Sequence, residues 1–171
     1  MKSIYVAAAL AAACGSASAQ FVELTGSQNI TETGQTFVFT FDGLLPAASE
    51  GTLVIEGLGD FSVVPPSLET LDWDIDGIAS GQGFDASAFS GTVDLFQNAV
   101  SQSWTISLAD MVAITSDGSL TITLVASSAV NFYADQPEDF LSVNLSYTAI
   151  PAPGAVAVLG AGGLLAARRR R

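Results

Sequence analysis

The chain has 171 residues, of which 17 are Asp or Glu, 5 are Lys or Arg and none is His. The basic residues stand only at the two ends, so the stretch between Lys2 and Arg168 carries all 17 acidic residues and no positive side chain. This excludes nucleic-acid binding through a basic surface. The lack of His, Lys, Arg and Cys in the central region also excludes a Ser-His-Asp or Cys-His catalytic centre.

The first 19 residues have the layout of a secretory signal peptide. After a positively charged start, Ile4 to Ala13 is an apolar run too short to span a bilayer, because a helix needs about 20 residues for that. Ala17 and Ala19 form the small-x-small pattern that signal peptidase reads, so we expect cleavage before Gln20 and export of the rest. Lipid attachment at Cys14 is the alternative, although the Leu before it stands one residue too far away for the usual lipoprotein box.

Residues 20–149 predict a single all-β domain. Apolar and polar side chains alternate, as is typical of strands with one buried and one solvated face. Turn residues separate the alternating segments and several are Asp-Gly pairs. A short helical turn is admitted only near Ala109 to Ile114. We therefore expect an antiparallel β-sandwich, for which a jelly roll is one arrangement. The alternating segments are Phe37 to Phe41, Leu53 to Ile55, Leu71 to Ile75, Trp104 to Leu108, Leu120 to Leu124 and Leu141 to Tyr147.

Three aspartates are the candidate metal ligands. Asp72, Asp74 and Asp76, followed by Gly77, match the first half of the D-x-D-x-D-G calcium loop, in which alternate carboxylates converge on a hard cation. The Glu that such a loop carries at its twelfth position is replaced by Gly83. The same pattern fits a strand whose outward residues are aspartates and whose exit is an Asp-Gly turn. A calcium site and a solvated strand face are the two interpretations.

Exposed aromatic side chains would indicate a carbohydrate-binding sandwich. Trp73 and Trp104 fall on the apolar phase of their strands, so we expect both in the core. The better candidates for exposed aromatic side chains lie in less periodic segments and are Phe61, Phe84, Phe89 and Phe132.

Pairs of carboxylates can serve a glycosidase, but the 17 acidic residues are scattered and no pair stands out. Nothing is present to activate a nucleophile, so we expect no catalysis.

The last part of the chain, residues 150–171, has three sections. A short proline motif comes first, an uncharged apolar stretch follows, and four arginines end the chain. The stretch from Ala155 to Ala167 reaches only about 20 Å as a helix, short of the roughly 30 Å hydrocarbon core, which predicts weak or transient membrane anchoring. The arginines favour the cytoplasmic side and leave the acidic domain outside. The motif is Pro151, Ala152 and Pro153, and the membrane stop is Arg168, Arg169, Arg170 and Arg171.

This order of proline motif, apolar segment and Arg cluster resembles the PEP-CTERM sorting signal of Gram-negative bacteria. Pro151 and Pro153 match the two prolines of that family, while Ala152 stands in place of its Glu. The resemblance covers the tail alone. It implies recognition by an exosortase, a membrane transpeptidase-like enzyme, and display at the cell surface or in an extracellular polysaccharide matrix. A plain C-terminal membrane anchor is the alternative for the tail.

Together these features predict an exported structural or adhesion protein without catalysis, handled first by signal peptidase and then by an exosortase-like enzyme. Extracellular polysaccharide is the expected partner, and calcium is the one cofactor suggested. The alternative function is a carbohydrate-binding β-sandwich module.

Overall fold

The computed structural model describes residues 19–61, 69–84, 87–92, 97–128, 130 and 138–150. Ala17, the proline motif and the four terminal arginines lie outside these ranges. Within them no helix is long and apolar enough to cross a membrane. The described elements are β1 (Gln20–Asn29), β2 (Thr36–Asp42), β3 (Gly51–Gly59), β4 (Leu71–Ile75), β5 (Ala79–Gly83), β6 (Phe89–Thr92), β7 (Asn98–Ile106), α1 (Leu108–Ile114), β8 (Ser119–Ala126) and β9 (Phe140–Ala149).

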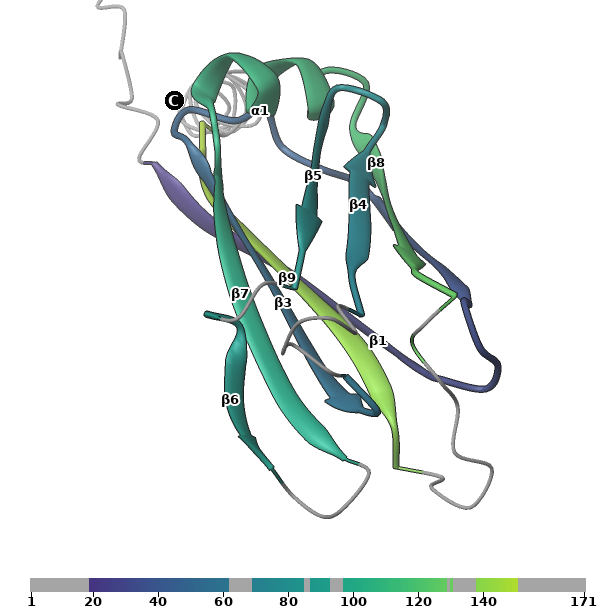
Figure 1. Cartoon of the computed structure of the whole chain (residues 1–171). Coiled ribbons are helices and arrows are strands. Elements are labelled where there is room, and N and C mark those ends of the chain that lie inside the picture. The colour runs from purple at the N-terminus through teal and green to yellow at the C-terminus, as the bar shows by residue number, and fades with distance from the viewer. Residues whose placement is uncertain are drawn as a thin grey trace, which may run out of the picture.

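The strands form two antiparallel sheets that pack face to face (Figure 1). One sheet has the order β1-β9-β3-β7-β6 and the other the order β2-β8-β4-β5. When the short edge strand β6 is set aside, each sheet keeps four strands, and the chain wraps between the sheets in the order of a jelly roll. The prediction of an all-β antiparallel sandwich is confirmed, with the jelly-roll arrangement.

The core lies between the sheets and is built from alternate strand positions. Strand β9 shows this most fully, because it is an interior strand of its sheet, between β1 and β3. Its intervening residues are Ser, Asn and Thr apart from Phe140 and lie on the outer face, half-exposed. The alternation of apolar and polar residues in the sequence therefore predicted correctly which side of β9 faces the core. The buried residues of β9 are Leu141, Val143, Leu145, Tyr147 and Ala149.

Two tryptophans join the sheets. Trp73 on β4 and Trp104 on β7 have ring centroids 5.5 Å apart, with the rings tilted by 56°. Trp73 is buried and Trp104 is partly buried against the core, which confirms the expected phase of both residues. A Cβ atom on Gly81 would lie 2.7 Å from the Trp73 ring, and one on Gly83 would lie 2.8 Å from the Trp104 ring. The indoles thus fit beside β5 because two of its residues have no side chain.

Two phenylalanines expected at the surface are in the core instead. Phe61 is 0% exposed and Phe84 is 1% exposed, and their rings pack edge to face with centroids 5.4 Å apart. Phe61 lies two residues after the end of β3 and Phe84 directly follows β5, so the loss of periodicity beyond a strand did not mean exposure. Phe89 is 44% exposed, as expected. Phe132 lies outside the described residues.

A short helix, α1, covers one end of the sandwich (Figure 1). The Ser107 side chain caps it by accepting a hydrogen bond from the Asp110 backbone N–H at 3.2 Å. Met111 and Ile114 point into the core. The short helical turn that the sequence admits near Ala109 to Ile114 is present as α1. The alternating segment from Trp104 to Leu108 predicted a strand through Leu108. Strand β7 ends at Ile106 instead, because Ser107 caps the helix that begins at Leu108.

Hydrogen bonds from two buried side chains, Thr115 and Tyr147, hold the loop between β2 and β3 against this end. The Thr115 hydroxyl accepts the Ala47 backbone N–H at 3.0 Å and donates to the Met111 carbonyl at 2.7 Å. The Tyr147 hydroxyl donates to the Leu45 carbonyl at 3.0 Å. These bonds connect α1, the loop and β9. All described strands, the helix and the described core side chains lie in residues 20–150, so this segment is the unit to study as the folded domain.

Candidate functional site

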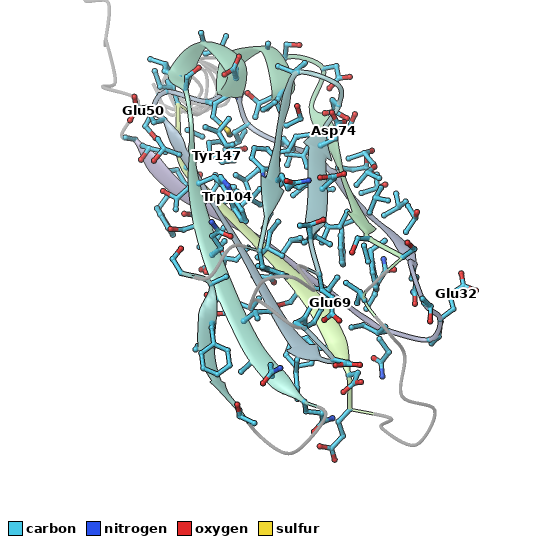
Figure 2. The ribbon with its side chains drawn as sticks, in the orientation of Figure 1. Glu32, Glu50, Glu69, Asp74, Trp104 and Tyr147 are labelled. Carbon is cyan, nitrogen blue, oxygen red and sulfur yellow. The ribbon has the colours of Figure 1, made fainter. Side chains whose placement is uncertain are left out.

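The predicted metal ligands lie on the outer face of the four-stranded sheet. Asp72 and Asp74 point outward from β4, on either side of the inward Trp73. Strand β4 pairs with β5 on one side and with β8 on the other, which brings polar side chains beside the aspartates. Figure 2 labels Asp74 on this face. The two aspartates and their neighbours on β5 and β8 line an open depression of about 320 Å³. Its lining includes Asp72, Asp74, Ser80, Gln82, Thr123 and Val125.

The first two aspartates have separate hydrogen-bond partners. Asp72 Oδ1 accepts a hydrogen bond from Gln82 Nε2 at 2.8 Å, across the β4–β5 pair. Asp74 Oδ1 accepts the backbone N–H of Gly77 at 2.8 Å and so closes the turn after β4. One carboxylate therefore links two strands, and the other shapes a turn.

The third aspartate belongs to the turn rather than to the strand face. Asp76 has a φ of 52°, in the left-handed region that Asp tolerates better than most residues. Its Oδ1 accepts the Thr121 backbone N–H at 3.0 Å, while its own N–H donates to the Thr121 carbonyl at 3.2 Å. The described residues contain no group of three His, Cys, Asp or Glu side chains that could hold a metal ion. The three aspartates form a strand face and a turn, and the structure does not bring them together.

We expect calcium to leave the stability of the domain unchanged. The segment 20–150 should give superimposable thermal unfolding curves in excess EDTA and in millimolar calcium at fixed ionic strength, because each aspartate already has its own partner. Calcium at 100 times its dissociation constant would add about 2.7 kcal/mol and raise the midpoint by several degrees. Such a rise, lost in Asp74→Asn, would show that the aspartates rearrange around the ion.

Acidic groups are spread over the whole domain. Glu32 and Glu50 lie at opposite ends of the molecule in Figure 2. Asp139 is buried and its Oδ1 accepts a hydrogen bond from Gln97 Nε2 at 2.6 Å. Burial raises the pKa of Asp60 above the ordinary value of 3.8. Since residues 20–149 contain 17 acids and no base, salt should stabilise the domain by screening this repulsion.

Burial acts in the same direction on the buried tyrosine of β9. It raises the pKa of the Tyr147 hydroxyl above the ordinary value of 10.0, so this group stays protonated at neutral pH and can donate to the Leu45 carbonyl.

A second open depression lies on the outer face of the five-stranded sheet. It also measures about 320 Å³, and hydroxyl, amide and carboxylate groups line it. Both outer faces can therefore offer hydrogen bonds to a hydroxyl-rich ligand. The sequence did not single out these residues, because only strand pairing brings them together. The polar residues that line this second depression are Thr25, Ser27, Glu56, Ser142 and Asn144.

The partners of the aspartates were also missed. Strand β5 reads Ala-Ser-Gly-Gln-Gly and has no alternating apolar residues that would mark it as a strand. The signal available was the Asp76-Gly77 turn. A hairpin folded back through it places Gln82 opposite Asp72 and Ser80 opposite Asp74.

Comparison with known proteins gives little further information. No protein-family model matches the chain, and no curated protein matches it. Among solved structures, the VP2 subviral particle of infectious bursal disease virus has a TM-score of 0.41 at 15% identity, over 88% of this chain and 37% of that chain. The Macrobrachium rosenbergii nodavirus P-domain has a TM-score of 0.35 at 18% identity, over 77% of this chain and 92% of that chain. The chain thus spans little more than a third of the VP2 chain.

Proposed function

We propose that this chain is an exported structural or adhesion protein of a bacterial cell surface, processed at a C-terminal sorting signal and without catalytic activity. The observation that carries the proposal is the distribution of charge along the sequence. A positive leader and a four-arginine end enclose a domain with 17 acids and no base. Both ends then favour the same topology, with the acidic domain on the outer side of the membrane.

The place where the described chain ends supports processing next to the folded domain. The Ile150 backbone N–H donates to the Pro46 carbonyl at 3.2 Å, so the chain is bound into the domain up to the residue before Pro151. The end of β9 lies beside the start of β1, since Gln20 pairs with Ala149. Signal peptidase and an exosortase-like enzyme would therefore act on neighbouring points at one end of the domain.

The outer faces of the sheets support a role among polysaccharides. Their side chains are mainly hydroxyls, amides and carboxylates, which form hydrogen bonds with sugar hydroxyls and keep the domain soluble. In this role the domain is a stable, negatively charged module held at the surface or released into the matrix.

Processing of the full chain tests the proposal. In a host with an exosortase, we expect mass spectrometry to find mature protein that begins at Gln20 and ends near the proline motif, in the surface or medium fraction. Replacing Pro151 and Pro153 with alanine should leave the tail attached and the protein in the membrane fraction. Val156→Ala, just beyond the motif, is the control and should be processed normally. An intact tail in wild-type protein from that host would contradict the proposal.

The alternative function is a carbohydrate-binding module, which the two outer depressions favour. A glycan panel followed by thermal unfolding separates the two functions. A binding module gains stability with one glycan and loses the gain in Gln82→Ala or in Asn144→Ala, depending on which depression binds. A structural domain responds to none.

A further inference from the structure

Strand β1 is an edge strand with an open side. All ten of its residues pair with β9 in continuous register, and no strand of the described chain lies on its other side. Alternate residues of such a strand present backbone N–H and C=O groups on the side away from the paired neighbour, and these groups can pair with a further strand. At the end of β1, the Asn29 carbonyl accepts a hydrogen bond from Gln35 Nε2 at 3.2 Å.

The other three sheet edges are shorter or protected. Strand β6 has four residues and a register shift, and β5 has five residues. On β2, the Val38 carbonyl is already bonded to Gln28 Nε2 at 2.7 Å. By contrast, β1 reads Gln-Phe-Val-Glu-Leu-Thr-Gly-Ser-Gln-Asn, without Pro, Lys or Arg and without a bulge. The strand itself therefore lacks the prolines, basic side chains and bulges by which proteins often protect an edge.

The one charge on β1 is drawn away from the open side. Glu23 Oε1 accepts a hydrogen bond from Asn144 Nδ2 at 2.6 Å, and Asn144 belongs to β9, on the paired side of the strand. Phe21, on the same outward face, is 67% exposed. The open edge is therefore nearly free of charge and carries an exposed aromatic ring, on a domain whose surface is otherwise acidic.

We propose that β1 pairs antiparallel with β1 of a second copy of this chain, which joins the two five-stranded sheets into one continuous sheet. A two-fold axis at Thr25 places that residue opposite its copy, so outward residues face outward residues. Glu23 then lies opposite Ser27, and Phe21 opposite Asn29. No carboxylate faces another across this pairing, which is why the edge fits a copy of itself. The proposal does not depend on the proposed function.

Sedimentation velocity on the segment 20–150 tests the pairing. We expect a dimer whose dissociation constant falls as salt rises from about 0.05 to about 0.5 M, because each copy carries the same net negative charge. Thr25→Glu puts like charges at the axis and should raise the dissociation constant about tenfold or more. Thr52→Glu is the matched control, because Thr52 is exposed on the same face but lies on β3, which is paired on both sides. It should leave the dimer intact.

Disulfide trapping gives a second test that needs no loss of stability. The segment contains no cysteine, so Thr25→Cys introduces a single thiol. Under oxidation it should yield a covalent dimer, while Thr52→Cys stays monomeric. Thr40→Cys, on the β2 edge, should also stay monomeric. A wild-type monomer at all salt concentrations, an intact dimer in Thr25→Glu, or crosslinking only through Thr40→Cys would each overturn the proposal.

Discussion

Replacing Gly81 with alanine should lower the free energy of unfolding by about 2 to 3 kcal/mol, which is large for the addition of one methyl group. The new Cβ would lie 2.7 Å from Cζ2 of Trp73 and 2.8 Å from Cε2 and Nε1. The Trp73 indole cannot easily move away from the new methyl group, because it is buried and also packs against the Trp104 ring. Either β5 moves away from the sheet or the two indoles repack.

Urea and thermal unfolding measure this loss, and the midpoint should fall by roughly 10 °C. Gly91→Ala is the matched control, because a Cβ there meets no heavy atom within 4 Å, and its unfolding curve should match that of the wild type. The tryptophan emission of folded Gly81→Ala should also shift. Equal stability of the two variants would mean that β5 adjusts freely and that the close approach of Trp73 does not matter.

Replacing Thr115 with valine should destabilise the domain by about 2 to 3 kcal/mol with almost no change in shape. Thr115 is 1% exposed, and its hydroxyl is the partner of both the Ala47 N–H and the Met111 carbonyl. Valine removes the acceptor, so the backbone N–H of the β2–β3 loop loses its bond beside a buried methyl group. The loop and α1 would then lose their direct link.

Thr115→Ser separates the hydroxyl from the methyl group. It keeps both hydrogen bonds and should cost clearly less than the valine variant, about 1 kcal/mol for the lost methyl. Hydrogen exchange should show faster exchange at Ala47 in Thr115→Val alone. If serine proves as harmful as valine, the packing of the methyl group, and not the hydrogen bond, stabilises this end of the sandwich.

The strands with strict apolar alternation could be predicted from the sequence, and the others could not. The alternating segments correspond to β2, β3, β4, β7, β8 and β9, six of the nine strands. Strands β1, β5 and β6 lie at three of the four sheet edges, where one neighbour is missing and fewer apolar residues are needed. The fourth edge strand, β2, does alternate, because it buries Phe37 and Phe39 in the core. The inward residues of β1 are only half-buried and end in Gly26 and Gln28, so the strand shows no clear hydrophobic pattern.

The candidate site was predictable only in part. Asp72 and Asp74 were correctly placed on a solvated strand face by alternation alone. Whether they converge with Asp76 depends on the turn, where the backbone bonds to Thr121 on a strand far along the chain. Long-range pairing of this kind has no local signature. Gln82 and Ser80 pair locally through the β4–β5 hairpin and were missed for a different reason, because β5 has no alternating apolar residues.

The central position of β9 sets the order in which the domain can be completed. Its sheet needs this last strand between β1 and β3, and the bond from Asn144 to Glu23 connects residues that are 121 positions apart. A chain that crosses a membrane starting from its N-terminus must therefore remain without a closed core until β9 has emerged. Long-range pairing also makes folding slow, which leaves time for passage through a channel that accepts only unfolded polypeptide. If the chain is exported as proposed, the domain would complete its fold only after translocation.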